Sequence, residues 1–184
     1  ENGLHDNRVA EVMVNKDGIY AGYEKGFVSI ISGETVQHLM VPSSQAIGTA
    51  VRFIVSDDKE KGAYVGTGSS VYYINNGKVY SNSPSLTLDK MLYMREMIKA
   101  QEWGYWFATV RGVSHYNSDK LVYSSNDQHD FSALVFSIAQ QSDGSIPFGT
   151  INGLWRYRNA KYEYLGANNS LLTNQINSIV KEPN

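Results

Sequence analysis

Few residues of this chain have the type and spacing that catalysis or metal binding requires. The 184 residues include four histidines, His5, His38, His115 and His129, and no cysteine. Zinc sites and activated nucleophiles need such groups at set spacings, for example two histidines one helical turn apart, and these histidines show no such spacing. The sequence also lacks a Gly-x-Ser-x-Gly elbow and an order of serine, histidine and aspartate typical of hydrolases. We therefore interpret the histidines as surface or turn residues and expect no catalytic residue, no metal and no cofactor.

Two short segments resemble ion-binding or phosphate-binding loops but lack the necessary partners. Asp57, Asp58 and Glu60 form an acidic turn whose spacing does not follow a calcium-binding loop. The run from Gly66 to Ser70 is rich in glycine, yet it lacks the lysine and the following helix of a phosphate-binding loop. We interpret the first segment as a solvated hairpin turn and the second as a turn between strands.

Composition favours a sheet protein and disfavours nucleic acid as a partner. Lys plus Arg number 16 and Asp plus Glu 18, so the net charge of -2 leaves no basic excess to bind phosphates. Thirteen Tyr, three Trp, six Phe and 16 Gly, against four Pro, are typical of short strands joined by tight turns. No apolar run approaches the roughly 18 residues that span a bilayer. We expect an all-β segment that contacts neither nucleic acid nor a membrane.

One pattern recurs along the chain: a glycine, an aromatic or apolar strand, a small residue, Thr or Tyr, and a turn. The small residue is Gly22, Gly66, Ala108 and Gly149, at steps of 44, 42 and 41 residues. Each copy follows one apolar segment and precedes two more, which makes four short strands per repeat. Four strands in about 40 to 45 residues is the size of a β-propeller blade.

The repeat also predicts where the blades begin and end. Each blade is expected to be a four-stranded antiparallel meander, and the last residues begin another copy because residues 169–179 repeat residues 2–12. We expect a partial β-propeller, an excerpt of a longer array such as a seven-bladed propeller. The expected blades cover about residues 1–44, 45–86, 87–127 and 128–168, with the start of a fifth repeat at residues 169–184.

The second strand of each copy is expected to face a neighbouring blade. Tyr20, Tyr64 and Trp106 occupy the same position in three copies, and an aromatic ring there can fill the space between two blades. In the fourth copy the Pro147-Phe148 pair stands there, displaced by one extra residue. Since proline cannot donate to a central ladder, we expect a bulge or a broken second strand in that blade.

One segment of the third copy has a competing interpretation. Residues 89–100 carry methionines at near-helical spacing, which is also typical of an amphipathic helix. Register with the other copies predicts a strand over residues 94–99 instead.

These motifs resemble the two-component regulator propeller repeat, which occurs in periplasmic sensor regions of hybrid histidine kinases of Bacteroidetes. The resemblance covers essentially the whole chain, and the four copies keep one register. The matching residues are Asn2-Gly3-Leu4, Asn7-Arg8-Val9, Asp17-Gly18 and Gly22 in the first copy, and Gly149-Thr150-Ile151-Asn152-Gly153-Leu154-Trp155-Arg156-Tyr157 in the last.

Propeller geometry predicts where a ligand would bind. The loops that join second to third strands and the loops that join consecutive blades share one face, which we call the top face. Aromatic rings beside charged and amide groups suit a polyhydroxylated ligand, which needs donors, acceptors and an apolar surface. The candidate ligand-binding residues on this face are Tyr23, Glu24, Lys25, Arg111, Asn152, His129 and Asp130.

The resemblance implies a ligand-sensing segment of a periplasmic sensor that recognises a glycan fragment and signals to a histidine kinase. The expected partners are an oligosaccharide, the remaining blades and signalling domains of a parent chain, and a second copy in a homodimer. Two alternatives stay open at this stage. One is a propeller enzyme, a glycan lyase or hydrolase, with Glu24 and Asp130 as members of a carboxylate pair. The other is a passive scaffold for protein interactions.

Overall fold

A computed structural model describes residues 3–42, 49–57, 62–68, 70–81, 93–117, 120–125, 133–166 and 175–180. The chain divides into two compact units, Glu1–Met94 and Arg95–Asn184. All regular structure in the described residues is β-strand, as expected, and none of these residues belongs to a helix that could cross a membrane.

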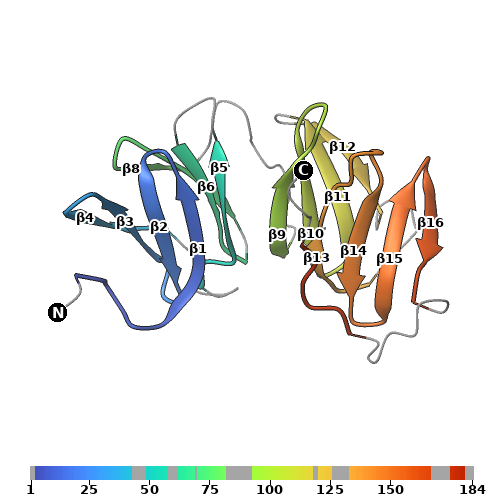
Figure 1. The fold of residues 1–184 in the computed structure, drawn as a ribbon, viewed down its shortest axis with the longest axis horizontal. Helices are drawn as coiled ribbons and strands as arrows, with labels where there is room; N and C mark the ends of the chain where they lie inside the picture. Colours follow the sequence, from blue (N-terminus) through green and yellow to red (C-terminus); the bar gives the residue numbers. More distant parts are fainter. Residues whose placement is uncertain are drawn as a thin grey trace. The chain divides into compact units, whose positions relative to one another are not determined.

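The first unit contains two antiparallel four-stranded sheets, each with its strands in chain order. Figure 1 draws these strands in blue to green. The first sheet consists of β1 (Val9–Asn15), β2 (Gly18–Tyr23), β3 (Phe27–Ser32) and β4 (Thr35–Met40). The second consists of β5 (Phe53–Asp57), β6 (Gly62–Gly66), β7 (Val71–Asn75) and β8 (Lys78–Tyr80).

The second unit repeats the same topology in two further four-stranded meanders (Figure 1). Four-stranded meanders in sequence are the blades of a β-propeller, so the predicted fold class is confirmed. The third sheet consists of β9 (Met94–Lys99), β10 (Tyr105–Thr109), β11 (Gly112–Asn117) and β12 (Lys120–Ser124). The fourth consists of β13 (Val135–Ile138), β14 (Ile146–Thr150), β15 (Gly153–Arg158) and β16 (Lys161–Tyr164).

The methionine-rich segment of the third copy is the strand β9, so the prediction from register is confirmed. Met94 and Met97 are three positions apart, so they lie on opposite faces of the strand. Both are nevertheless buried, and neither is more than 2% exposed. Helical spacing therefore misleads here, because this strand is covered on more than one side.

The expected broken second strand is wrong, but a bulge does occur in this blade, at a place other than Pro147. Pro147 pairs with Arg156 inside an unbroken β14–β15 ladder. The register shift of this blade lies in the preceding ladder, between Val135 and Ser137. The Pro147 carbonyl oxygen accepts from the Ala139 N–H at 3.0 Å, and Ala139 lies just past the end of β13, where the ladder no longer requires an N–H donor from Pro147.

At two places a backbone hydrogen bond beside a glycine joins a blade to the segment that follows it. In the first unit the N–H of Val51 donates to the Tyr23 carbonyl at 3.0 Å, next to Gly22. In the second unit the N–H of Ile176 donates to the Thr150 carbonyl at 3.0 Å. Residues 175–180 thus contact the fourth blade as Val51 contacts the first, and the expected start of a fifth repeat stays a prediction.

Trp106 lies between the third and fourth blades, as its position in the repeat predicts. Its side chain is 7% exposed and belongs to a core cluster with Phe148 of the fourth blade. The indole stacks on His115 at 4.5 Å between ring centroids and lies 5.8 Å from the ring of Tyr157. Figure 1 shows β10 and β14 on the neighbouring sheets that hold these rings.

A second contact joins the first strands of neighbouring blades in the second unit. The Glu96 carboxylate accepts a hydrogen bond from the Ile138 N–H at 2.8 Å. One blade later, the Ser137 hydroxyl accepts from the Ile179 N–H at 3.1 Å. Burial of Glu96 raises the pKa of its carboxyl, and hydrogen bonds from Ser137 and Ile138 oppose that shift only in part.

Replacement of Trp106 tests the assignment of the core. Trp106→Ala should lower the free energy of unfolding by about 3–5 kcal/mol, because it removes a buried ring and leaves a cavity. Arg111→Ala, at an exposed turn, should change stability by no more than about 0.5 kcal/mol. Urea unfolding followed by far-UV circular dichroism measures both. The reverse order of effects would show that the inside and outside of this blade are interchanged.

The buried Glu96 carboxyl should make stability depend on pH. Because its pKa is raised in the folded chain, folding favours the protonated form, and this contribution is lost as the pH rises above the ordinary value of 4.5 and through the raised pKa. Glu96→Gln keeps an oxygen to accept from Ile138 and carries no charge. The difference in urea midpoint between the variant and the wild type should therefore grow in favour of the variant as the pH is raised from 4 to 7. An identical difference at both pH values would contradict this account.

Candidate functional site

A threonine hydroxyl builds the turn between second and third strands in the third blade. The Thr109 Oγ1 donates to the Gly112 carbonyl at 3.0 Å and accepts from the Arg111 N–H at 3.1 Å. Thr109 is buried, whereas Arg111 is exposed. The side chain thus closes the turn from inside and leaves Arg111 directed at solvent.

The same turn recurs in the fourth blade. The Thr150 Oγ1 donates to the Gly153 carbonyl at 2.9 Å and accepts from the Asn152 N–H at 3.0 Å. In the second blade the Thr67 Oγ1 donates to the Ser70 carbonyl at 3.3 Å. The repeated threonine, which the sequence pattern contains but does not explain, therefore fixes this turn in three of the four blades.

Tyr23 takes the position of this threonine in the first blade and is not a surface residue. Its side chain is only 1% exposed, and its hydroxyl lies 2.8 Å from the Ser29 Oγ. A sugar in solution cannot stack on a ring buried in this way. Alignment with Thr109 and Thr150 was the sequence signal that Tyr23 points inward.

Glu24 and Lys25, the next two candidates, are exposed on the β2–β3 turn. Glu24 forms an ion pair with Arg8 at 3.2 Å, and Arg8 lies 3.7 Å from Asp6. The backbone N–H of Arg8 donates to the Asp6 carboxylate, which lowers the pKa of that carboxyl. Since these side chains are largely solvated, the ion pairs contribute little to stability, and the charges stay accessible to a ligand.

The candidate residues fall into two groups. Glu24 and Lys25 belong to the first unit, whereas Arg111 and Asn152 lie on equivalent turns of neighbouring blades in the second. His129 and Asp130 lie outside the described residues. The described structure therefore supplies two exposed turns in one unit, held by buried threonines and carrying a guanidinium and an amide.

The second unit also has a hollow of about 370 Å³ along β9, β13 and residues 175–180. Ile98 and Ile138 give it apolar walls, while Lys99, Gln101 and Gln140 supply polar groups. The Gln101 N–H donates to the Gln140 side-chain oxygen at 2.7 Å, which fixes one edge. The sequence pattern did not indicate this hollow because its walls come from three successive repeats.

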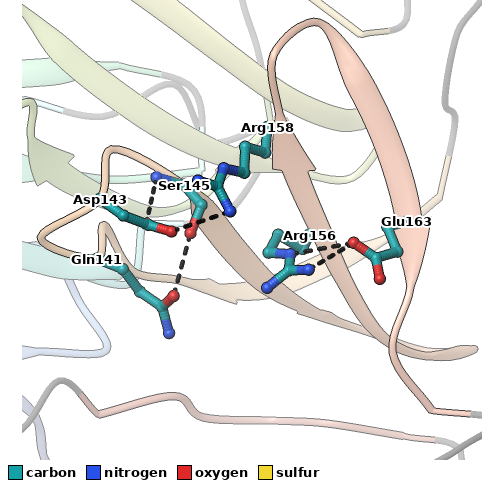
Figure 2. Close-up of polar contacts among 6 residues, drawn as sticks. All are labelled: Gln141, Asp143, Ser145, Arg156, Arg158 and Glu163. Carbon is teal, nitrogen blue, oxygen red and sulfur yellow. Dashed lines mark hydrogen bonds and ion pairs between the residues drawn. The ribbon is translucent and has the colours of Figure 1, made fainter.

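Charged side chains gather at the other end of the fourth sheet. Arg158 lies 3.4 Å from the Asp143 carboxylate, and Arg156 contacts the Glu163 carboxylate at 2.6 Å. Hydrogen bonds from Ser145 lower the pKa of the Asp143 carboxyl. Because each arginine faces a carboxylate, the cluster does not form a site for an anion, and since these side chains are partly solvated, the ion pairs contribute little to stability. Figure 2 shows the cluster, which consists of Gln141, Asp143, Ser145, Arg156, Arg158 and Glu163.

Removal of one turn hydroxyl tests how the candidate site is held. Thr150→Val keeps the shape of the side chain but removes both hydrogen bonds, so it should destabilise the chain by about 1–3 kcal/mol and speed hydrogen exchange at the Asn152 amide. Thr35→Val removes a single hydrogen bond at an exposed turn and should cost less than about 0.5 kcal/mol. Urea unfolding and amide exchange give the two readouts. Equal effects of the two substitutions would contradict the role assigned to Thr150.

No protein-family model matches the sequence, and the comparison with curated protein sequences also gives no match. Fold similarity to solved structures is clear. The extracellular domain of the hybrid two-component system BT3049 from B. thetaiotaomicron is 22% identical with a TM-score of 0.74, over 98% of this chain and 25% of that chain. The corresponding domain of BT4673 from the same organism is 17% identical with a TM-score of 0.72, over 95% of this chain and 25% of that chain.

A third solved structure extends the similarity to another group of propellers. The WD40 β-propeller domain of Doa1 is 11% identical with a TM-score of 0.66, over 92% of this chain and 56% of that chain. At these identities the likeness concerns the fold. The chain spans about a quarter of the length of the two B. thetaiotaomicron domains. Its architecture is that of consecutive β-propeller blades.

Proposed function

We propose that this chain is a ligand-sensing β-propeller segment of a two-component sensor, located in the periplasm, and that it recognises a glycan or a glycan fragment. Binding at the top face of the propeller is relayed to a histidine kinase in the parent protein. In this proposal the segment carries no catalytic residue. Its role is to present part of a binding surface and to transmit the bound state through blade-to-blade contacts.

The observation that supports the sensor role most strongly is the agreement of two independent comparisons. The motifs resemble the propeller repeat of hybrid two-component sensors. The fold matches the extracellular domain of the hybrid system BT3049 over 98% of the chain, although identity is 22%. Either comparison alone would fit many propellers, but together they favour one class.

The chemistry of the turns supports a polyhydroxylated ligand. Arg111 offers several N–H donors, and Asn152 offers both a donor and an acceptor. Both lie on turns that buried threonine hydroxyls hold in one conformation, so little conformational entropy is lost when a ligand binds. Val110 and Ile151, which precede them, are exposed by 37% and 45% and add apolar surface against which a sugar ring can pack.

A thermal shift screen tests this proposal on the 184-residue chain. Oligosaccharides released from a panel of polysaccharides are added one at a time, and the melting temperature is recorded. One class of oligosaccharide should raise the melting temperature, and the rise should saturate as its concentration increases. Arg111→Ala combined with Asn152→Ala should weaken binding at least about tenfold, a loss of about 1.4 kcal/mol, and leave the melting temperature of the free chain unchanged.

Lys161→Ala is the matched control, because Lys161 is exposed at the opposite end of the same sheet as Asn152. Its binding should equal that of the wild type. Cleavage of a polysaccharide by the chain, seen as new reducing ends, would replace the sensor proposal with an enzymatic one. A panel that produces no shift would favour a scaffold for protein interactions.

A further inference from the structure

The first sheet carries a pair of histidines that the proposed function does not use. Side chains alternate along β3, and Val28 joins the core that the first sheet forms with β5–β8. Ser29 and its cross-strand partner His38 therefore lie on the opposite face, the outer face of the first sheet. The segment before β1 runs along this face, because the ring of His5 stacks on Phe27 with 3.8 Å between centroids.

We propose that His5 and His38 form a binding site for a divalent transition-metal ion of the Cu²⁺, Ni²⁺ or Zn²⁺ class, with water completing the coordination. The two ring centroids are 5.6 Å apart, and the rings are tilted by 55°. Metal–nitrogen bonds of about 2.0–2.1 Å place two imidazole centroids on one ion roughly 5 Å apart. Small rotations of two exposed rings are enough to close that difference.

A hydrogen-bonded chain of buried hydroxyls orients one of the two rings. The His38 Nδ1 lies 2.8 Å from the Ser29 Oγ, which lies 2.8 Å from the Tyr23 hydroxyl. Ser29 is completely buried and Tyr23 nearly so. When Nδ1–H donates to Ser29, the Nε2 of His38 keeps its lone pair and faces away from the sheet. Histidines that bind metals are commonly held through their second ring nitrogen in this way.

Aromatic contacts orient the other ring. His5 stacks on Phe27 and lies edge-on to Tyr23 with 5.9 Å between centroids. The same Tyr23 thus touches His5 through its ring and reaches His38 through its hydroxyl and Ser29. Two histidines 33 positions apart in the sequence are therefore fixed by one buried tyrosine.

The ligands determine the class of ion. Imidazole nitrogen suits copper, nickel and zinc, whereas calcium and magnesium require oxygen ligands. The described residues contain no group of three or more histidine, cysteine, aspartate or glutamate side chains arranged to hold a metal. A site here has two protein ligands and open positions for water, so its ion is exchangeable rather than a permanent part of the fold.

Calorimetric titration of the 184-residue chain with Zn²⁺ tests the proposal, and electron paramagnetic resonance of the Cu²⁺ complex identifies the ligands. One ion per chain is expected, with two coordinated imidazole nitrogens. His5→Gln and His38→Gln should each weaken Zn²⁺ binding at least about tenfold, since even the loss of a group that supports a ligand costs about 10–100-fold. His129→Gln leaves the same number of histidines in the chain and should bind as the wild type does.

A further variant separates an oriented site from two independent surface histidines. Ser29→Ala keeps both imidazoles but removes the partner of the His38 Nδ1, so Zn²⁺ binding should weaken about tenfold while far-UV circular dichroism stays unchanged. Because His5 and His38 are exposed, their replacement by glutamine should also preserve the fold. The proposal is overturned if the Cu²⁺ spectrum shows fewer than two imidazole nitrogens, or if binding responds to His5→Gln but not to His38→Gln. Binding lost in His129→Gln would overturn it as well.

Discussion

Each unit contains a glycine, Gly22 or Gly149, at a junction where a side chain would not fit. A Cβ atom on Gly22 would lie 2.5 Å from Val51, and one on Gly149 would lie 2.5 Å from the Ile176 carbonyl oxygen. Cβ atoms essentially never approach other atoms so closely, so these two positions require glycine, whereas Ala108 of the third blade keeps its Cβ and packs with Val135 of the fourth. That approach brings the Val51 and Ile176 amides to the carbonyls of the preceding blade. At these two junctions the spacing is thus set by the backbone.

Because the backbone fixes the junction, the side chains that fill the space beside it are free to differ. In the third blade the row that crosses the sheet at this level is Trp106, His115 and Tyr123, which pack as stacked or tilted rings. The equivalent row of the fourth blade consists of Pro147, Arg156 and Glu163 and contains an ion pair. A hydrophobic wedge and a charged surface therefore occupy the same position in two copies of one repeat. Copies of the repeat can therefore keep the same small residue at the junction and still differ in the polarity of the side chains beside it.

Much of this fold could be predicted from the sequence because its main determinants are local and repeated. The regular spacing of Gly22, Gly66, Ala108 and Gly149 predicted the blades, and the register of the copies identified β9 as a strand despite its methionines. Features that depend on a neighbour could not be predicted in this way. Pro147 lies opposite Ala139, which is past the end of β13, and the buried hydroxyl of Tyr23 has a hydrogen-bond partner in Ser29.

The same limit applies to the candidate site. Arg111 and Asn152 were identified as exposed turn residues, and the structure places both at the surface. Neither the sequence around His5 nor that around His38 predicts that the two residues lie close together, because the contact arises where one chain segment folds back over a sheet.

The threonine turn has a consequence for how such proteins diversify. Its hydroxyl bonds only to backbone atoms, at Arg111 and Gly112 in one blade and at Asn152 and Gly153 in the next. The two residues between the threonine and the glycine can therefore change identity without altering the path of the chain. Each blade then offers a two-residue cassette on a constant frame, and an array of blades can acquire a new specificity by substitution at a few such cassettes, much as antibody loops vary on a fixed sandwich.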